Sequence, residues 1–505
     1  MKPRERCVSS TGLVLISLLS TMITAGCGSS RVSSQVAPTQ NPLVAQYNVV
    51  PTAAASGAQG WVEFGPTTSY GRQTSRVSPI QRGFVIPILV AGMKPSTTYH
   101  MRAHVIWPDG TTWVDQDHTF TTGALPAALT PPGITVTEPT PGLSPAPGVE
   151  LLSLNEPSGT NMLQSVVTDL QGNIIWYYQA GAFPIKLLPN GHLILNTDSD
   201  LREIDLAGNT IRDVSVAQVN QALLTIGRSF TIINFSHDVL VLPNGHWITI
   251  GQISQNYTDL PGYPGVTAVL GDVVVDIDTA GNVVWAWSAF DYLDVNRHPF
   301  FGLPDWTHSN ALVYTADGNL LLSMRAQSWI LKLDYANGSG SGNILWKLGE
   351  DGDFTITGGD PSQWFYAQHY PNILSVDGTQ STMAVYDDGN YRLDVNGVSC
   401  GSSPAPACYS RATIFQIDET TDVATLLWQD LPGFFSSWGG SIGTLGNGDV
   451  EFANSAPVPS PSTSSIFEVT PNENSQVVWQ MNINGENAYR GYRIPSLYPG
   501  IIWNQ

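Results

Sequence analysis

The chain has 505 residues, including 48 glycines, 35 prolines and 15 tryptophans, and a formal net charge of -20 at pH 7. This length and turn-rich composition predict two or more β-rich domains rather than layers of helices. The acidic charge, without a cluster of Lys and Arg, argues against nucleic acid as a partner. An anionic small molecule would need a local group of cations to bind against the overall field.

Residues 1–26 are predicted to form the signal peptide of a lipoprotein. Lys2, Arg4 and Arg6 precede GLVLISLLSTMI, an apolar stretch too short to cross a bilayer as a mature helix. The stretch runs into ITAGC, which resembles a bacterial lipobox, where cleavage precedes a cysteine that becomes acylated. We therefore expect Cys27 to anchor an exported protein to a membrane, on the periplasmic side of the outer membrane or at the cell surface. The alternative is an ordinary signal peptide with an incidental cysteine.

Three sections are expected between the signal peptide and the main domain. Residues 27–44 are rich in Ser, Pro and Gln and predict a flexible tether. From 45 to 122, short runs alternate apolar and polar residues, and GMKPSTTYHMRAHV resembles a strand pair of a fibronectin type III β-sandwich. It stays open whether this sandwich pairs protomers in a homodimer or shields a site. The Pro-rich section 123–148 predicts a linker.

Residues 149–505 contain a repeated unit that predicts their fold. The unit reads Asp, two residues, Gly-Asn, two apolar residues and Trp, as in DLQGNIIW and DTAGNVVW. A sixth copy, starting at Asp205, lacks the tryptophan. The other five copies, some degenerate, end at Trp176, Trp285, Trp346, Trp428 and Trp479.

A second unit is an Asn-Gly or Asp-Gly turn followed by an apolar strand. It occurs as LPNGHLIL, LPNGHWITI, TADGNLLLS, YDDGN and LGNGDVEFA. Glycine supplies the positive φ that such a hairpin turn requires. Alternating hairpins with one tryptophan per unit predict an all-β fold, a six-bladed β-propeller. A β-helix, the alternative, would need shorter and more regular rungs.

Four segments depart from plain blade packing. NFSHDVLV contains His237, DWTHSN contains His308 and Asn310, LLLSMRAQ contains Arg325, and QWFYAQH contains His369. Each histidine precedes an apolar strand that leads towards a glycine turn, so the three occupy similar positions in their blades. Because the inner strands of a propeller converge on one channel, we expect these side chains to meet at one end of it.

Three imidazoles with one guanidinium and one amide predict a site for an oxyanion such as sulfate or phosphate. Three histidines would also suit Zn²⁺ or Cu²⁺, but the positive charge of Arg325 favours an anion. The sequence therefore predicts no metal and no other cofactor. Asp238 is interpreted as an orienting partner of a histidine. Each histidine taken alone would also fit a structural role. Because the three histidines occupy similar positions in successive repeats, a common binding site is favoured.

Cys400 and Cys408 remain in the folded part of the chain. An exported compartment is oxidising, and the Gly, Ser, Pro and Ala residues between them let the chain bend back on itself. We expect a disulfide that braces a small loop, with two free thiols as the alternative.

Together, the lipobox, the small sandwich, the six-fold tryptophan repeat and the segments SHDVLVLPNGH, DWTHSNAL, SMRAQSWILKLD and QHYPNIL resemble the bacterial arylsulfate sulfotransferase family. The resemblance covers nearly all of the chain after the signal peptide. Members are exported six-bladed propellers that move a sulfuryl group from a phenolic sulfate ester to another phenol through a sulfohistidine, without a nucleotide donor. The resemblance thus implies an aryl sulfate donor, a phenolic acceptor and ping-pong kinetics.

The resemblance also implies roles for single residues. His369 would be the nucleophile, which requires a neutral imidazole. His308, Asn310, Arg325 and His237 would bind and polarise the sulfuryl oxygens or the bridging oxygen. A protonated His308 or His237 would exchange a proton with the phenol oxygen.

Further expectations concern the surroundings of these residues. Trp306 and Tyr366 are expected to line the channel where aryl rings bind, with core packing as the alternative. Tyr370 follows His369 where the family leads us to expect an acidic residue, so the group that orients the imidazole is not identified. The YRGYRIP segment, which contains Arg490, is expected to close the propeller. The alternative to an enzyme is a surface lipoprotein that binds a sulfated or glycan ligand without turnover.

Overall fold

The computed structural model describes residues 32–504 except 52–55, 81–83, 156–160, 183, 300–301, 359–362, 394–396, 402–407, 459–462 and 473. The predicted signal peptide and Cys27 lie outside the described residues. Strands dominate the described part, in agreement with the prediction of an all-β protein. Its few helices are short, and none is long and apolar enough to cross a membrane.

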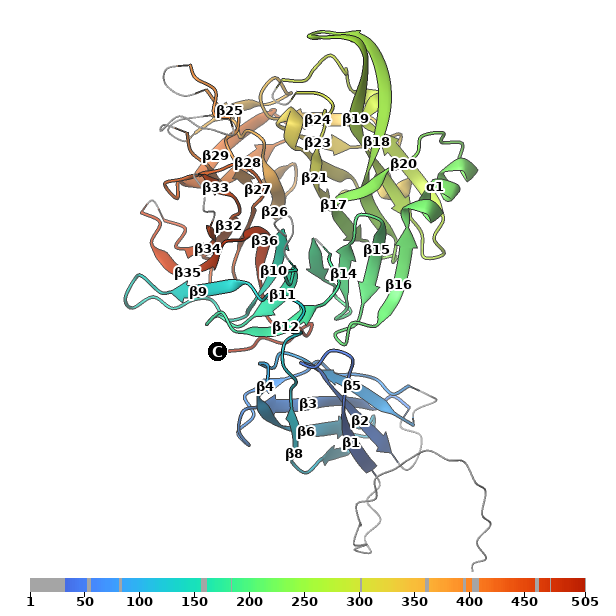
Figure 1. The fold of residues 1–505 in the computed structure, drawn as a ribbon, viewed down its shortest axis with the longest axis vertical. Coiled ribbons are helices and arrows are strands. Elements are labelled where there is room, and N and C mark those ends of the chain that lie inside the picture. The colour runs from blue at the N-terminus through green and yellow to red at the C-terminus, as the bar shows by residue number, and fades with distance from the viewer. Residues whose placement is uncertain are drawn as a thin grey trace, which may run out of the picture.

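The N-terminal part forms two antiparallel sheets that share one hydrophobic core (Figure 1). Strand β6 alternates buried and half-buried residues along its length, as expected for a strand with one face on a core. The first sheet contains β1 (Val32–Pro38), β2 (Ala45–Pro51) and β5 (Ile86–Val90), and the second contains β3 (Gln59–Gly65), β4 (Arg72–Gln73), β6 (Thr98–Ile106), β7 (Thr112–Val114) and β8 (His118–Thr121).

The predicted tether and linker differ from the structure in two places. β1 pairs with β2 over its whole length, so residues 32–38 belong to the sandwich and not to a flexible leash. In the predicted linker, β9 (Gly133–Thr137) pairs with β35 (Val477–Asn484) at the edge of a sheet. Composition indicates flexibility only on average, whereas short alternating runs such as VSSQVAP and GITVT still pair with an available sheet edge.

Beyond the sandwich, six sheets of four or five strands follow one another in the described residues. They contain, in sequence, β10 (Val149–Asn155), β11 (Ser165–Thr168), β12 (Ile174–Tyr178) and β36 (Asn487–Ile494); β13 (Ile185–Leu187), β14 (Leu193–Asn196), β15 (Asp200–Ile204) and β16 (Thr210–Ser215); β17 (Asn234–Val241), β18 (Trp247–Leu260), β19 (Tyr263–Ile277) and β20 (Val283–Ser288); β21 (Ser309–Tyr314), β22 (Leu320–Met324), β23 (Trp329–Leu333) and β24 (Ile344–Leu348); β26 (His369–Asp377), β27 (Gln380–Asp387), β28 (Arg411–Asp418), β29 (Val423–Asp430) and β25 (Thr355–Thr357); and β31 (Ser441–Thr444), β32 (Val450–Asn454), β34 (Thr463–Val469), β35 and β9. The remaining elements are α1 (Val216–Thr225), α2 (Ala289–Tyr292), the 3₁₀ turns η2 (Arg325–Gln327) and η3 (Ala336–Gly338), and the pair β30 (Phe435–Ser436) and β33 (Pro457–Val458).

The six sheets lie around a common centre (Figure 1). The innermost strands of successive sheets contact one another from β17 to β21, β26, β31 and β36, and β14, the second strand of its sheet, contacts β17. β36 closes the ring, because this strand from the end of the chain pairs with β10 of the first sheet. Side chains that are far apart in sequence therefore meet at the centre.

The tryptophan repeat marks the fourth strand from the centre in each sheet. Its copies lie on β12, β16, β20, β24, β29 and β35. Three of the indoles donate a hydrogen bond to a turn of the next sheet: Trp176 to the Leu206 carbonyl, Trp285 to that of Gly340 and Trp479 to that of Leu170. The repeat therefore joins neighbouring sheets as well as filling each one.

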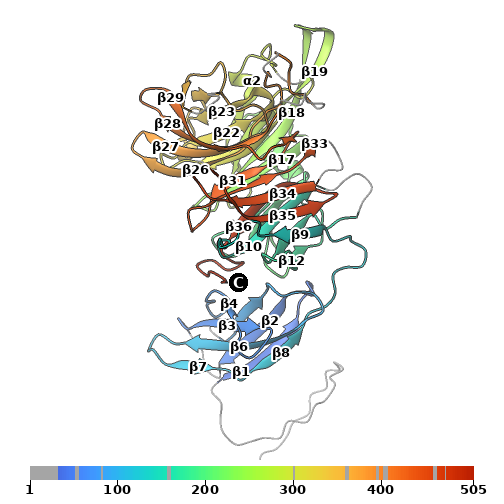
Figure 2. The same ribbon diagram turned by 90° about the vertical axis from the view of Figure 1, so that its left-hand side faces the viewer.

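The last described residues pack against the sandwich (Figure 2). The hydroxyl of Tyr498 accepts a hydrogen bond from the Ala91 amide at 2.7 Å and donates to the Leu89 carbonyl at 2.9 Å. The Trp503 ring is buried against Phe64, and the guanidinium of Arg72 lies over it. The segment that follows β36 thus fastens the ring to the sandwich.

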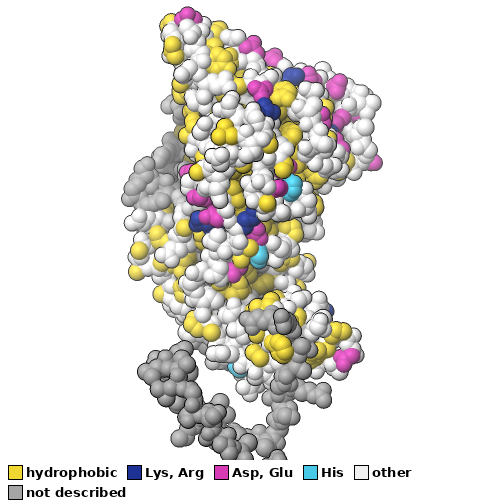
Figure 3. All heavy atoms as spheres, turned by 90° about the vertical axis from the view of Figure 1, so that its right-hand side faces the viewer, with side chains coloured by type: hydrophobic (Ala, Val, Ile, Leu, Met, Phe, Trp, Pro, Cys, Tyr) yellow, Lys and Arg dark blue, Asp and Glu magenta, His cyan; other side chains and the backbone are white. Residues whose placement is uncertain are grey.

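Charged side chains are sparse on the face shown in Figure 3, where single Lys and Arg residues lie among Asp and Glu. No basic patch is gathered on that face. The cations that matter for the site are buried at the centre of the ring.

Candidate active site

Three inner strands are irregular at the predicted histidines. The pairing register shifts at His237 in β17, just after His308 in β21 and just after His369 in β26. The backbone is left-handed at His237, His308 and Tyr370, with φ of 42°, 46° and 49°. Such strain costs about 1–3 kcal/mol per residue and concentrates at functional sites, and bulges re-aim side chains. The three segments therefore share a local structure that plain blade packing does not require.

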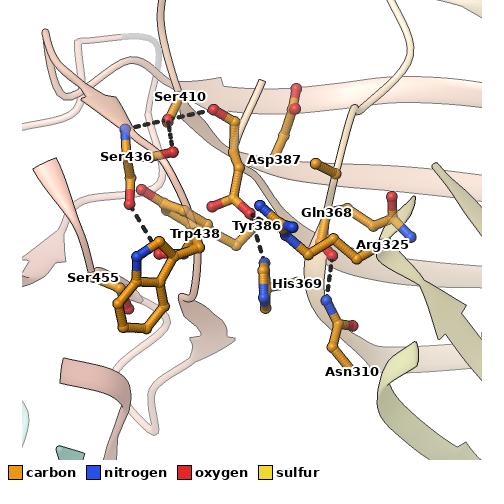
Figure 4. A network of polar contacts seen from close by, with 12 residues as sticks. Asn310, Arg325, Gln368, His369, Tyr386, Asp387, Ser410, Ser436, Trp438 and Ser455 are labelled. Atoms are coloured by element: carbon orange, nitrogen blue, oxygen red, sulfur yellow. Dashed lines mark hydrogen bonds and ion pairs between the residues drawn. The ribbon is translucent and has the colours of Figure 1, made fainter. Parts of the chain in front are cut away.

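His369 is oriented by a carboxylate. Its Nδ1 lies 2.6 Å from Oδ2 of Asp388, and the two side chains are 2% and 0% exposed (Figure 4). Burial raises the pKa of Asp388 well above 3.8, the charge of Arg325 opposes this rise, and the charge of Asp387 adds to it. In its ionised form the carboxylate accepts the hydrogen of Nδ1 and leaves the lone pair on Nε2. Nε2 makes no hydrogen bond to any described residue. The imidazole is therefore positioned to react through Nε2.

The surroundings keep His369 neutral. Burial lowers the pKa of His369 well below 6.5, and electrostatic interactions with Arg325, His237, His308 and Arg490 lower it further. A neutral imidazole is the form that attacks an electrophile.

Arg325 lies between two of the predicted segments. Its backbone amide donates to the His308 carbonyl at 3.2 Å, which places the guanidinium at the centre of the ring. Nη2 donates to the Ser437 carbonyl at 2.9 Å, and Nε lies 4.0 Å from Oδ2 of Asp388. This buried guanidinium supplies positive charge beside His369.

His237 and His308 lie side by side, with ring centroids 4.8 Å apart. Nδ1 of His308 is 2.5 Å from Oδ2 of Asp305, whereas Nδ1 of His237 is 2.5 Å from the hydroxyl of Ser236. Burial, followed by the charges of His308, Arg490 and Arg325, lowers the pKa of His237 well below 6.5. Although burial opposes it, the hydrogen bond to His308 and its charge lower the pKa of Asp305. The Asp305 carboxylate thus lies against Nδ1 of His308, and His237 stays neutral.

Asn310 lies in the same cluster but is held by the protein. Its Nδ2 donates to the Gln368 carbonyl at 2.8 Å (Figure 4). Its buried Oδ1 has no hydrogen-bond partner among the described residues. Its amide therefore fixes the residue before His369. A role of Asn310 in polarising the sulfuryl group stays a prediction.

The two predicted aromatic residues have different environments. Trp306 is 1% exposed, donates its indole N–H to the Arg297 carbonyl and packs against Phe290, so it is a core residue and not a channel wall. Its ring fills the space beside Gly271. Tyr366 is half-buried and lines a cavity of about 500 Å³ together with Trp364 and Tyr391.

Sequence reasoning missed Asp388, because YDDGN was interpreted as a hairpin turn. The turn between β26 and β27 is instead at Gly378, and YDDGN begins in the last two residues of β27, at the opposite end of that strand. Asp387 is also buried there, bound by Arg392 and Arg411. Two aspartates at the end of the apolar run MAVY were the available signal, since paired acids are rarely buried without a partner.

The cysteine prediction is confirmed. Cys400 and Cys408 form a disulfide with a Cα–Cα distance of 5.6 Å. The Cys400 amide donates to the Arg392 carbonyl at 2.9 Å, so the bridge braces the loop that follows Asp388. In the described part of the chain, no three His, Cys, Asp or Glu side chains converge as metal ligands would.

A family model described as Arylsulfotransferase (ASST) matches residues 147–493. No curated protein matches the sequence. A solved protein of unknown function from Bacteroides caccae is 11% identical, with a TM-score of 0.39 over 67% of this chain and 94% of its own. A protein from Lactobacillus plantarum is 10% identical, with a TM-score of 0.35 over 67% and 82% of the two chains. Likeness at this level does not bear on activity.

Proposed function

Because the chain belongs to the arylsulfotransferase family, we propose that it moves a sulfuryl group from an aryl sulfate ester to a phenolic acceptor, through a sulfohistidine at His369. The observation that carries this proposal is the buried hydrogen bond between Nδ1 of His369 and Asp388. It supports attack by Nε2, beside the Arg325 guanidinium. No nucleotide donor is required, because the ester itself supplies the sulfuryl group.

In the first half-reaction, Nε2 of His369 attacks sulfur in line with the bridging oxygen. The N–S bond forms as the S–O bond to the aryl group breaks, and the sulfuryl oxygens carry the charge of a loose transition state. Arg325 and the neutral His237 stabilise these oxygens electrostatically. His308, paired with Asp305, gives its proton to the departing phenolate.

In the second half-reaction, the acceptor phenol attacks the same sulfur. Its oxygen forms the new S–O bond, the N–S bond breaks, and its proton returns to His308. Protons and charge balance over the cycle, and His369 regains its neutral form. A phenolate, with a pKa of about 10, leaves far more readily than an alkoxide, so aryl esters are the expected donors.

Several features support the architecture and location that belong to this proposal. The six sheets around one centre would be the six blades of a β-propeller, and the N-terminal sandwich a fibronectin type III-like domain. The Cys400–Cys408 disulfide is typical of an oxidising, exported compartment. A lipid on Cys27 would hold the protein at a membrane, with aryl sulfates and phenols as its small-molecule partners.

The test is a rapid-mixing experiment with 4-nitrophenyl sulfate. In the absence of acceptor we expect a burst of nitrophenolate equal to the enzyme concentration, followed by steady turnover when phenol is added. Mass spectrometry of the quenched protein should find one SO₃ group on His369. His369→Ala should show no burst, and His246→Ala, which removes a histidine from an outer turn, should keep it. Stoichiometric binding of the ester without nitrophenolate release would instead indicate a binding protein.

A further inference from the structure

We propose that Arg490 is a positioning residue of the active site: one guanidinium, carried by the strand that closes the ring, fixes the segments that bear all three histidines. The proposal rests on the function proposed above, because it assigns Arg490 to the geometry of that reaction. Sequence reasoning gave this residue a structural role only.

The contacts of Arg490 reach each histidine segment. Nη2 donates to the Asn310 carbonyl at 2.6 Å, two residues after His308. Nη1 lies 3.3 Å from Oδ1 of Asp238, the neighbour of His237. Asn310 in turn donates to the carbonyl of Gln368, the neighbour of His369. A single side chain therefore connects β17, β21 and the start of β26.

Strand β36 is irregular next to Arg490. β36 has a bulge opposite Ser153 and Leu154, where Tyr489 is left out of the pairing with β10. The Tyr489 ring lies 5.8 Å from the ring of His237 and 5.9 Å from that of His369. Arg490 is fully buried, with its guanidinium over the rings of Tyr370 and Tyr489. Tyr489 thus contacts two imidazoles, while Arg490 binds the Asp238 carboxylate and the Asn310 carbonyl.

Closing the ring does not by itself account for Arg490. β36 already pairs with β10 through a backbone ladder, and its second buried arginine, Arg493, binds Glu150 and Glu468. Those ion pairs fasten the strand to β10 and β34. Both NH₂ groups of Arg490 instead bind residues of the histidine segments, namely Asp238 and Asn310. A lysine ammonium is a point charge and cannot span the two acceptors as a planar fork does.

The experiment compares Arg490→Lys with Arg493→Lys, two buried arginines of one strand that keep their charge. We expect both to lower the melting temperature. Only Arg490→Lys should slow the nitrophenolate burst, by about 10²-fold, because displacement of about 1 Å at the reacting groups has that effect. The burst of Arg493→Lys should stay close to that of the parent protein. Equal burst rates in the two variants would overturn the proposal.

A second measurement does not depend on turnover. Nitrogen NMR of the imidazoles reports the pKa values of His237 and His369, which face Arg325, His308, Asp388 and Arg490. In Arg490→Gln the loss of a positive charge should raise the pKa values of both histidines. In Arg493→Lys these two pKa values should not change. Unchanged values in a folded Arg490→Gln protein, or unfolding of both Arg490 variants, would reduce Arg490 to a structural residue. If the parent protein shows no burst, the proposed function fails while this titration still tests Arg490.

Discussion

The Asp388 carboxylate holds Nδ1 of His369 at 2.6 Å, and no solvent reaches the carboxylate. The pair links the ends of two strands, β27 and β26, at the centre of the ring. It fixes which imidazole nitrogen carries the hydrogen, and this choice decides whether His369 can act as a nucleophile.

Replacing Asp388 by Asn should therefore impair the chemical step. The amide of Asn can donate to Nδ1 and stabilise the tautomer with hydrogen on Nε2, which has no lone pair to attack sulfur. We expect kcat to fall by about 10²–10⁴-fold with a small change in KM. The burst rate with 4-nitrophenyl sulfate measures this effect.

The matched control is Asp276→Asn. Asp276 is also buried and lies 3.0 Å from Nδ1 of a histidine, His246, in an outer turn of the ring. This variant loses the same kind of contact away from the site, so its burst rate should stay near that of the parent. Equal losses in the two variants would contradict the orienting role of Asp388.

Acidification should destabilise the fold through His237. Its pKa in the folded protein is well below 6.5, so the unfolded chain binds a proton that the folded chain does not as the pH falls below 6.5. The free energy of unfolding should therefore decrease on acidification, by up to about 1.4 kcal/mol per pH unit. Urea titrations between pH 7 and 5 in parent and His237→Gln should differ in slope by this amount. Equal slopes in the two proteins would contradict this role of His237.

The disulfide should stabilise the loop after Asp388. Cys400 and Cys408 are eight residues apart, and closing a loop of that size restricts the unfolded chain by about 2–3 kcal/mol. Reduction should lower the unfolding midpoint of the parent. The unfolding midpoint of the double variant Cys400→Ser, Cys408→Ser should equal that of the reduced parent and should not change with reductant. A change with reductant would show that the effect of reduction does not come from this disulfide.

Packing between the tail and the sandwich can be tested with two glycines that share a backbone conformation. Gly92 and Gly71 have φ of +94° and +98°, so alanine is strained at both. A Cβ at Gly92 would lie 2.3 Å from the Trp503 ring, whereas nothing lies within 4 Å of a Cβ at Gly71. Gly92→Ala should be the more destabilising by about 1–3 kcal/mol in thermal unfolding. In a Trp503→Leu background, this difference should shrink.

The periodic parts of the sequence predicted the ring of sheets. One tryptophan per unit, as in Trp176 and Trp285, marks the fourth strand of a sheet because the indole both fills that strand and reaches the next sheet. The shared phase of His237, His308 and His369 likewise brought three segments together at the centre. These signals work because they repeat with the structural unit.

The non-periodic parts were harder to predict. Asp388 lies in the pentapeptide YDDGN, which is typical of a turn, and only the pairing of β27 with β26 shows that it belongs to the end with the histidines. Trp306 looked like a channel residue because it is two positions from His308, yet its ring is buried against Phe290. Arg490 reaches Asp238 over 252 residues of sequence, a distance at which no local pattern operates.

Ring closure also has a consequence for synthesis. Tyr489 and Arg490 leave the ribosome after every histidine of the site, and their partners on β17 were made hundreds of residues earlier. Contacts of such large sequence separation form late and slowly in folding. A nascent chain that already contains His237, His308 and His369 therefore has no assembled site. The three imidazoles acquire their common geometry only when β36 arrives, so a cell that makes this protein has no active sulfotransferase on an incomplete chain.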